Sequence, residues 1–319
     1  MRRVAFVAIA ATGALAVPGT AAAHQHTGRV AVDYQATVAA LRPPLAGAVE
    51  ARVYPADLAL GLTALAPHRV VVLGFGGEPF LELGPRGTDV SRSSTTAAGL
   101  GLTRSLAGRG WQRYSSRPHL IWHDARLRGL PPGVDRRRWA IPVVVDGRRA
   151  ELTGTLTRVP SPPAWPWLAL GALFVAVAGV LLAMRGRRPQ QLGTAALGWV
   201  AGGATLLVAA GFAAAPTANE ATWTEVASEI LFALVGIAFL ALGSRGSHAF
   251  ATLLLGLLAL IVGLNDLPVL LHGVVLSALP ATVARTGVAL AISAGAAATA
   301  VAVVVYFDVE DDGPVPPRS

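Results

Sequence analysis

Two histidines, His24 and His26, lie two residues apart directly after the alanines at 21–23. If the chain is cut after Ala23, a free α-amine is followed by a histidine at position three. The amine, backbone nitrogens and imidazole then form the square-planar nitrogen set that Cu(II) prefers. Alternatively, His24 binds through its amine and its own ring, and a histidine from the fold completes the site. Both arrangements predict a Cu(II) site that depends on one cleaved bond, and a mobile polar tail is the alternative.

A further candidate metal ligand is His123, in the stretch HLIWHDARL at 119–127. On a strand, His119 and His123 share one face, but residues four apart are separated by about 13 Å, too far for one ion unless the strand bends. Asp124 points to the opposite face of such a strand. The alternative places Trp122 in the core and His123 at the surface, without a metal.

Ionisable residues also occur in the apolar second half of the chain. Glu225 and Glu229 are one helical turn apart, and Asp266 and His272 flank Pro268. Such groups are costly within a bilayer and usually face protein or water. If Pro268 breaks its helix, Glu229, Asp266 and His272 could line one cavity, as in a small transporter or channel. An interfacial loop with ordinary polar groups is the alternative.

Motifs for catalysis are missing from the sequence. The chain has no cysteine, which excludes disulfides, thiolate metal sites and cysteine nucleophiles. It also has no nucleotide-binding loop, G-x-S-x-G or HExxH. We therefore expect a protein that is not an enzyme.

The composition predicts the elements that must carry these residues. Of 319 residues, 53% are hydrophobic and 14% charged, which indicates a membrane protein. Residues 1–23 read as a signal peptide: Arg2 and Arg3 precede a short apolar run, and the alanines at 21–23 fit a cleavage site.

Residues 24–159 alternate apolar and polar side chains between turn signals, which predicts an antiparallel β-sandwich. Its clearest hairpin spans 139–159, with a two-residue type I′ turn at Asp146-Gly147. Other strands are expected at 29–38, 58–65, 69–75, 80–84 and 119–127, and a long loop at 91–110.

The formal charge of +8 falls on the β region, because residues 24–163 hold 18 Arg and 10 Asp plus Glu. Such a surface could meet anionic lipid headgroups or wall polymers. A solvated surface is the alternative, and no motif indicates nucleic-acid binding.

A stiff linker at 160–164 precedes a predicted bundle of about five transmembrane helices within 165–307, at 165–184, 192–214, 226–243, 249–271 and 285–307. Arg185, Arg187 and Arg188 lie in one short loop and Arg245 in another, whereas the intervening loop has no Arg. The positive-inside rule then places those loops in the cytoplasm, the β domain outside and the tail 308–319 in the cytoplasm of a multi-pass plasma-membrane protein.

Two stretches resemble a family of uncharacterised actinobacterial membrane proteins that have an exported β-domain and a short helical bundle. They are GEPFLELGPRG at 77–87 and WHD at 122–124. The resemblance covers most of the chain and implies topology, without an activity. Members of that family carry further histidines after Trp-His-Asp, where this chain has Ala125 and Arg128.

The chain order also resembles bacterial copper-resistance proteins in which a CopC-like β-sandwich precedes CopD-like helices. The shared features are a histidine at the mature start, the β-sandwich and a late Asp-Gly hairpin. The resemblance implies a copper-ligating histidine after that turn, where this chain has Arg148.

These observations predict an α+β membrane protein that handles or senses copper, or another divalent metal, at the cell surface through His24 and His26, with His123 as a further ligand. The alternative function is an interaction or scaffold module that binds a membrane-protein partner or wall polymer without metal. A small transporter or channel is the third.

Overall fold

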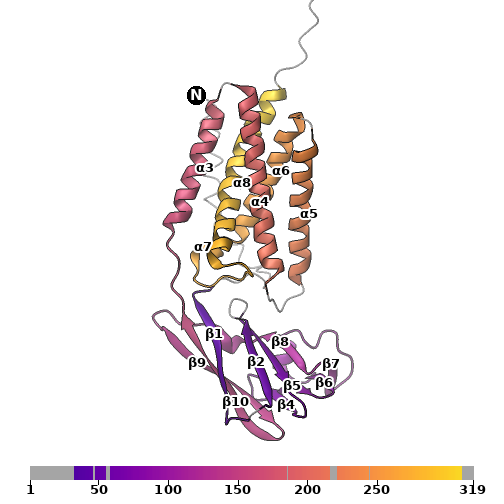
Figure 1. The fold of residues 1–319 in the computed structure, drawn as a ribbon. Helices are drawn as coiled ribbons and strands as arrows, with labels where there is room; N and C mark the ends of the chain where they lie inside the picture. The colour runs from indigo at the N-terminus through magenta and orange to yellow at the C-terminus, as the bar shows by residue number, and fades with distance from the viewer. Residues whose placement is uncertain are drawn as a thin grey trace, which may run out of the picture. The chain divides into compact units, whose positions relative to one another are not determined.

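The structure is a computed structural model that describes residues 32–45, 47–54, 58–184, 186–215, 221–243 and 245–310. These residues form two compact units, a β unit up to Ser161 and a helical unit from Pro162 onward (Figure 1). The predicted order of an antiparallel β region followed by apolar helices is confirmed. The predicted signal peptide, His24 and His26 lie outside the described residues, as do residues 311–319 of the predicted tail.

The β unit contains two antiparallel sheets. One has seven strands in the order β1-β10-β9-β4-β5-β6-β7, and the other has three in the order β2-β3-β8. The strands are β1 (Tyr34–Arg42), β2 (Val49–Tyr54), β3 (Ala59–Ala64), β4 (Val70–Leu73), β5 (Pro79–Gly84), β6 (Gly87–Ser91), β7 (Trp111–Ser115), β8 (His119–His123), β9 (Arg136–Val145) and β10 (Arg148–Arg158).

One hydrophobic core joins the two sheets. Alternate residues of β9 and β10, such as Ile141 and Leu152, are buried, as period-2 patterning requires. Phe80 of the larger sheet meets Trp122 of the smaller one edge to face, with ring centroids 5.9 Å apart. The two sheets therefore stabilise each other through shared apolar side chains.

The β9–β10 hairpin forms at the predicted turn. Asp146 and Gly147 have φ values of 49° and 82°, the left-handed pair that a type I′ turn needs. Further along the hairpin, Gly154 pairs with Trp139. A Cβ at Gly154 would lie 2.0 Å from Thr37 O and 2.2 Å from the Trp139 ring. Glycine is thus required at position 154, because the Trp139 indole and the β1 backbone leave no room for a Cβ there.

Part of the β unit differs from the prediction. β1 begins at Tyr34 and runs to Arg42, and β2, β6 and β7 are strands that the local sequence pattern does not predict. The predicted loop 91–110 contains the short helix α2 (Thr95–Gly99), and the predicted strand 119–127 ends at His123, before a 3₁₀ turn at Ala125–Leu127. β6 and β7 are short and polar, so pairing with neighbouring strands outweighs their weak local pattern.

The helical unit contains α3 (Trp165–Ala183), α4 (Arg187–Ala213), α5 (Ala221–Leu242), α6 (Arg245–Asn265), α7 (Pro268–Leu271) and α8 (Ala281–Glu310), with the long helices side by side (Figure 1). Four stretches are long and apolar enough to cross a membrane: 165–183, 187–213, 247–265 and 281–306. The described apolar part of α5, Val226–Leu242, is shorter. The predicted fourth helix, 249–271, is divided, because α6 ends at Asn265 and Pro268 begins α7.

Glycines bring α6 and α8 into close contact. A Cβ at Gly256 would lie 2.8 Å from Thr299 N, and a Cβ at Gly295 would lie 2.8 Å from Leu260 N. Small residues of this kind let two backbones approach where apolar burial between helices has no aqueous driving force. The α6–α8 pair therefore depends on the absence of side chains at these positions.

Candidate functional site

The Trp-His-Asp stretch is a structural network in which the acid and the indole are buried. Asp124 is 1% exposed and accepts a hydrogen bond from Trp122 Nε1 at 3.0 Å. Arg126 binds both carboxylate oxygens, at 2.8 and 2.7 Å, and its guanidinium also lies 4.9 Å from the centroid of the Phe75 ring. A charge pair with this many donors holds the start of the 3₁₀ turn in place.

The neighbouring histidines lie along one uninterrupted strand. His119 pairs with Thr63 and His123 with Ala59 in the β3–β8 ladder, whose register has no bulge. His119 Nδ1 lies 2.9 Å from Thr63 Oγ1. Two residues four apart on a regular strand are separated by about 13 Å, so one metal ion does not bridge this pair. A role for His123 as a metal ligand stays a prediction.

Other carboxylates of the β unit are also held by donors. Glu78 Oε1 accepts hydrogen bonds from Ser94 Oγ at 2.9 Å and from the Thr96 N–H at 3.1 Å, and its Oε2 accepts one from the Gly76 N–H at 3.0 Å. These bonds, chiefly those with Thr96, lower the pKa of Glu78 to about 2. Glu78 therefore ties the β4–β5 turn to the start of α2 as a permanent anion at neutral pH.

Two further acids lie on the outward face of the larger sheet and are neutralised by arginines on neighbouring strands or turns. Arg69 binds Glu82 through two hydrogen bonds, of 2.6 and 2.5 Å. Arg113 of β7 binds Asp89 of β6, the closer bond being 2.6 Å. A shallow hollow of about 60 Å³ lies between these pairs, beside the exposed Arg86. Because each acid has a cationic partner, this hollow offers no excess negative charge for a metal ion.

Beyond Asp89, the sequence becomes strongly basic. No Asp or Glu occurs from Val90 to His123. The same stretch carries five exposed arginines, at positions 92, 104, 109, 113 and 117. Of these, Arg113 is paired with Asp89, and the Arg92 guanidinium donates to the Leu106 carbonyl. We call these five arginines, with Trp111 and Tyr114, the β7 surface.

The β7 surface also exposes aromatic rings. Trp111 and Tyr114 of β7 are 40% and 41% exposed. Exposed aromatic and arginine side chains together are typical of binding surfaces. Sequence reasoning did not identify this surface. The signal in the sequence is the acid-free run between Asp89 and Asp124, which the charge balance of residues 24–163 as a whole does not reveal.

The predicted copper ligands His24 and His26 lie outside the described residues. Within the part of the chain that the structure describes, no three His, Asp or Glu side chains are grouped so that they could hold a metal ion. The resemblance to copper-resistance proteins implies a histidine directly after the Asp146-Gly147 turn. The structure has the exposed Arg148 at that position. Asp146 itself is 2.7 Å from His68 Nδ1.

The ionisable residues of the helical unit occur on separate elements. Glu229, on α5, is 6% exposed, and Asp266, just after α6, is 1% exposed. His272 follows α7, and its carbonyl accepts a hydrogen bond from Arg285 Nη2 at 2.8 Å. Arg285 also donates to the carbonyls of Val269 and Gly273, at 3.2 and 2.9 Å. This arginine on α8 thus fixes the chain around α7.

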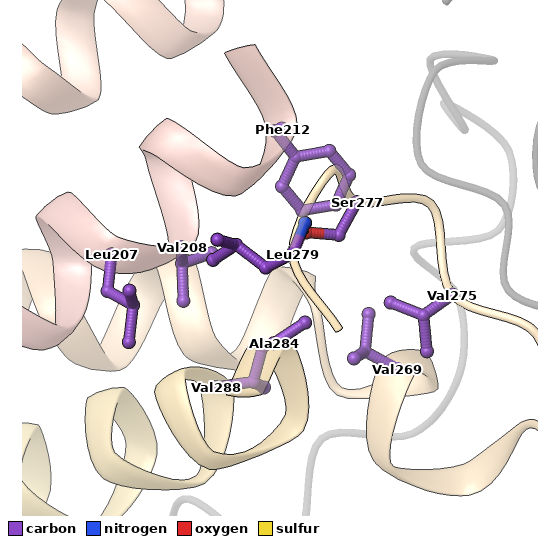
Figure 2. A pocket seen from close by; sticks show the side chains of 9 residues that line it. All are labelled: Leu207, Val208, Phe212, Val269, Val275, Ser277, Leu279, Ala284 and Val288. Atoms are coloured by element: carbon purple, nitrogen blue, oxygen red, sulfur yellow. The ribbon is translucent and has the colours of Figure 1, made fainter. Parts of the chain in front are cut away.

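A small apolar cavity lies at this part of the helical unit, and Figure 2 shows the side chains around it. Its volume is about 10 Å³, room for about one water-sized sphere, and Ser277 is the polar side chain among its lining residues. The others are Leu207, Val208, Phe212, Val269, Val275, Leu279, Ala284 and Val288. Glu229, Asp266 and His272 do not line it, so a transport role for these residues stays a prediction.

Comparison of the chain with protein-family models, curated proteins and solved structures finds no match. Among the residues that the structure describes, the β7 surface is the strongest candidate for a functional site.

Proposed function

We propose that this protein is a membrane-anchored recognition module, without enzymatic activity, whose β unit binds an acidic partner through the β7 surface. The observation that carries the proposal is the run from Val90 to His123, which has five exposed arginines and no acid. Trp111 and Tyr114 add apolar contact area beside the charge. Clustered cations of one sign attract an anionic ligand and raise its association rate.

The finer architecture belongs to the same proposal. In it, the two sheets are the layers of a β-sandwich, and α3, α4, α5, α6 and α8 cross the bilayer as five spans. Arg187 at the start of α4 and Arg245 at the start of α6 then lie on the cytoplasmic side, so the β unit lies outside and the partner is a wall polymer or a membrane protein. The support is the unequal distribution of arginine between the loops.

Binding to poly-L-glutamate by the full chain in phosphatidylcholine nanodiscs tests this function. Neutral lipid avoids competition from anionic headgroups. Changing Arg104, Arg109 and Arg117 together to Glu should weaken binding by about tenfold or more, because each exposed ion pair contributes about 0.5–1 kcal/mol. Wild-type affinity should also fall steeply as salt is raised.

The matched control changes Arg136, Arg138 and Arg149 to Glu. These arginines are also exposed and belong to β9 and β10, so the net charge changes by the same amount. The control should retain most of the wild-type affinity. Equal losses in both variants would mean that overall charge, and not the β7 surface, attracts the ligand, and the proposal would be wrong.

Copper binding at the cell surface remains the second candidate, favoured by the sequence His24-Gln25-His26 after the expected cleavage site. A free amine with a histidine at position three would chelate Cu(II) without help from the fold. Mature protein should therefore lose tight Cu(II) binding when both histidines are changed to Ala. Unchanged Cu(II) affinity in that variant would contradict this role.

A further inference from the structure

Strand β7 is an edge of the seven-stranded sheet in the described part of the chain. It pairs with β6 on one side through Trp111, Gln112, Arg113 and Ser115. The Arg92 N–H donates to the Gly110 carbonyl at 3.0 Å, which marks a hydrogen-bonded pair. Since these pairs alternate along an antiparallel ladder, the N–H and C=O groups of Trp111 and Arg113 point away from β6. Those backbone groups are available to another strand.

Edge strands are normally protected from such pairing. β7 is short, carries a charged Arg113 and lies opposite a register shift between Thr88 and Asp89. These features discourage association with a second copy, because arginines would face arginines. They do not explain two exposed aromatic rings on the same strand. The positive charge of the arginines on and beside β7 instead favours an acidic strand as the binding partner. Such a strand would be attracted, whereas a second copy of β7 is repelled.

We infer that β7 binds an extended acidic peptide segment of a partner protein by strand addition, an inference that rests on the proposed function of the β7 surface. The backbone of the segment would pair with Trp111 and Arg113, and its acidic side chains would lie beside Arg109 and Arg117. β7 itself covers about 13 Å from Trp111 to Ser115, and Arg109 and Arg117 lie in the segments that flank it. In strand addition, backbone hydrogen bonds supply affinity and side chains supply specificity.

The geometry predicts which ligand is recognised. Side chains at alternate positions of the added strand lie on one face, so acids at i and i+2 would both meet the outward face that carries Trp111 and Arg113. A probe with the sequence (Glu-Val)₄, acetylated and amidated, meets this requirement. A polyanion without a peptide backbone, such as polyacrylate, has the charge but no hydrogen-bonding edge.

The test measures binding of fluorescent (Glu-Val)₄ to the full chain in phosphatidylcholine nanodiscs. Two derivatives of equal charge are N-methylated at every Glu or at every Val, so that each loses the donors of one edge. One derivative should bind at least about tenfold more weakly than the parent peptide, the equivalent of about 1.4 kcal/mol. Amide exchange at Trp111 and Arg113 should slow when the parent peptide binds.

The possible outcomes distinguish strand addition from the proposed function, the recognition of an acidic partner at the β7 surface. If both N-methylated peptides and polyacrylate bind as well as the parent peptide, strand addition is wrong while acidic recognition survives. If no anionic probe binds, or if Arg109→Glu with Arg117→Glu changes nothing, the proposed function itself fails. The control variant Arg148→Glu with Arg149→Glu should bind the parent peptide with nearly unchanged affinity.

Discussion

Several acidic side chains of the β unit are bound by hydrogen-bond donors of the same unit. Four acids accept hydrogen bonds from the β unit itself. Glu78, Glu82 and Asp89 accept them from other segments of the chain, and Asp124 accepts one from the nearby Trp122. Donors within the fold therefore compensate the negative charge of these four side chains. Of the five arginines that follow Asp89, Arg113 pairs with that acid, and the run from Val90 to His123 contains no acid to balance the others, which leaves positive charge on the β7 surface.

Glu78 provides a pH-dependent test at this scale. Its folded pKa of about 2 lies below the ordinary 4.5, so its stabilisation is complete above about pH 4.5 and is lost as the pH falls toward 2. Glu78→Gln should weaken the α2 region by about 1–2 kcal/mol at neutral pH and remove much of this acid dependence. Hydrogen exchange of the α2 amides in the full chain measures both effects.

Glu151→Gln is the control for that experiment. Glu151 is exposed on β10, whereas α2 packs against β5. The control should leave the exchange of α2 and its pH dependence as in the wild type. An α2 region that opens with the same pH profile in Glu78→Gln and wild type would contradict the assigned role of Glu78.

At the scale of elements, the sequence predicts those strands and helices whose own pattern is strong. The β9–β10 hairpin was predictable because β-branched residues alternate around an Asp-Gly turn. β6 and β7 were not, because GTDVS and WQRYS are short and polar and become strands by pairing with β5 and each other. The β7 surface was missed for this reason: an edge is a property of the sheet and not of one segment.

The α6–α8 contact supplies a second prediction. Gly256→Ala should destabilise the helical unit by about 1–3 kcal/mol, because its Cβ would overlap the Thr299 backbone. Thermal unfolding in nanodiscs measures the loss. Gly203→Ala, on α4, is the control, since a Cβ there meets nothing within 4 Å. Helix propensity alone favours Ala over Gly, so a Gly203 variant as unstable as the Gly256 variant would contradict close packing as the cause of the loss.

At the scale of the whole molecule, the proposed topology leads to a labelling prediction. The chain has no cysteine, so one introduced thiol is a unique label. Arg149→Cys on β10 should react with a membrane-impermeant maleimide in intact cells, whereas Arg187→Cys at the start of α4 should react only after permeabilisation. Labelling of Arg187→Cys in intact cells with protection of Arg149→Cys would reverse the proposed orientation.

Anionic ligands should bind at the β7 surface, and photo-crosslinking maps where they bind. Poly-L-glutamate carrying benzophenone is irradiated with the full chain in phosphatidylcholine nanodiscs, and the modified peptides are mapped by mass spectrometry. Crosslinks should concentrate in residues 104–117, around Trp111 and Tyr114. Crosslinks spread evenly over the exposed arginines, or concentrated at Arg148 and Arg149, would contradict it.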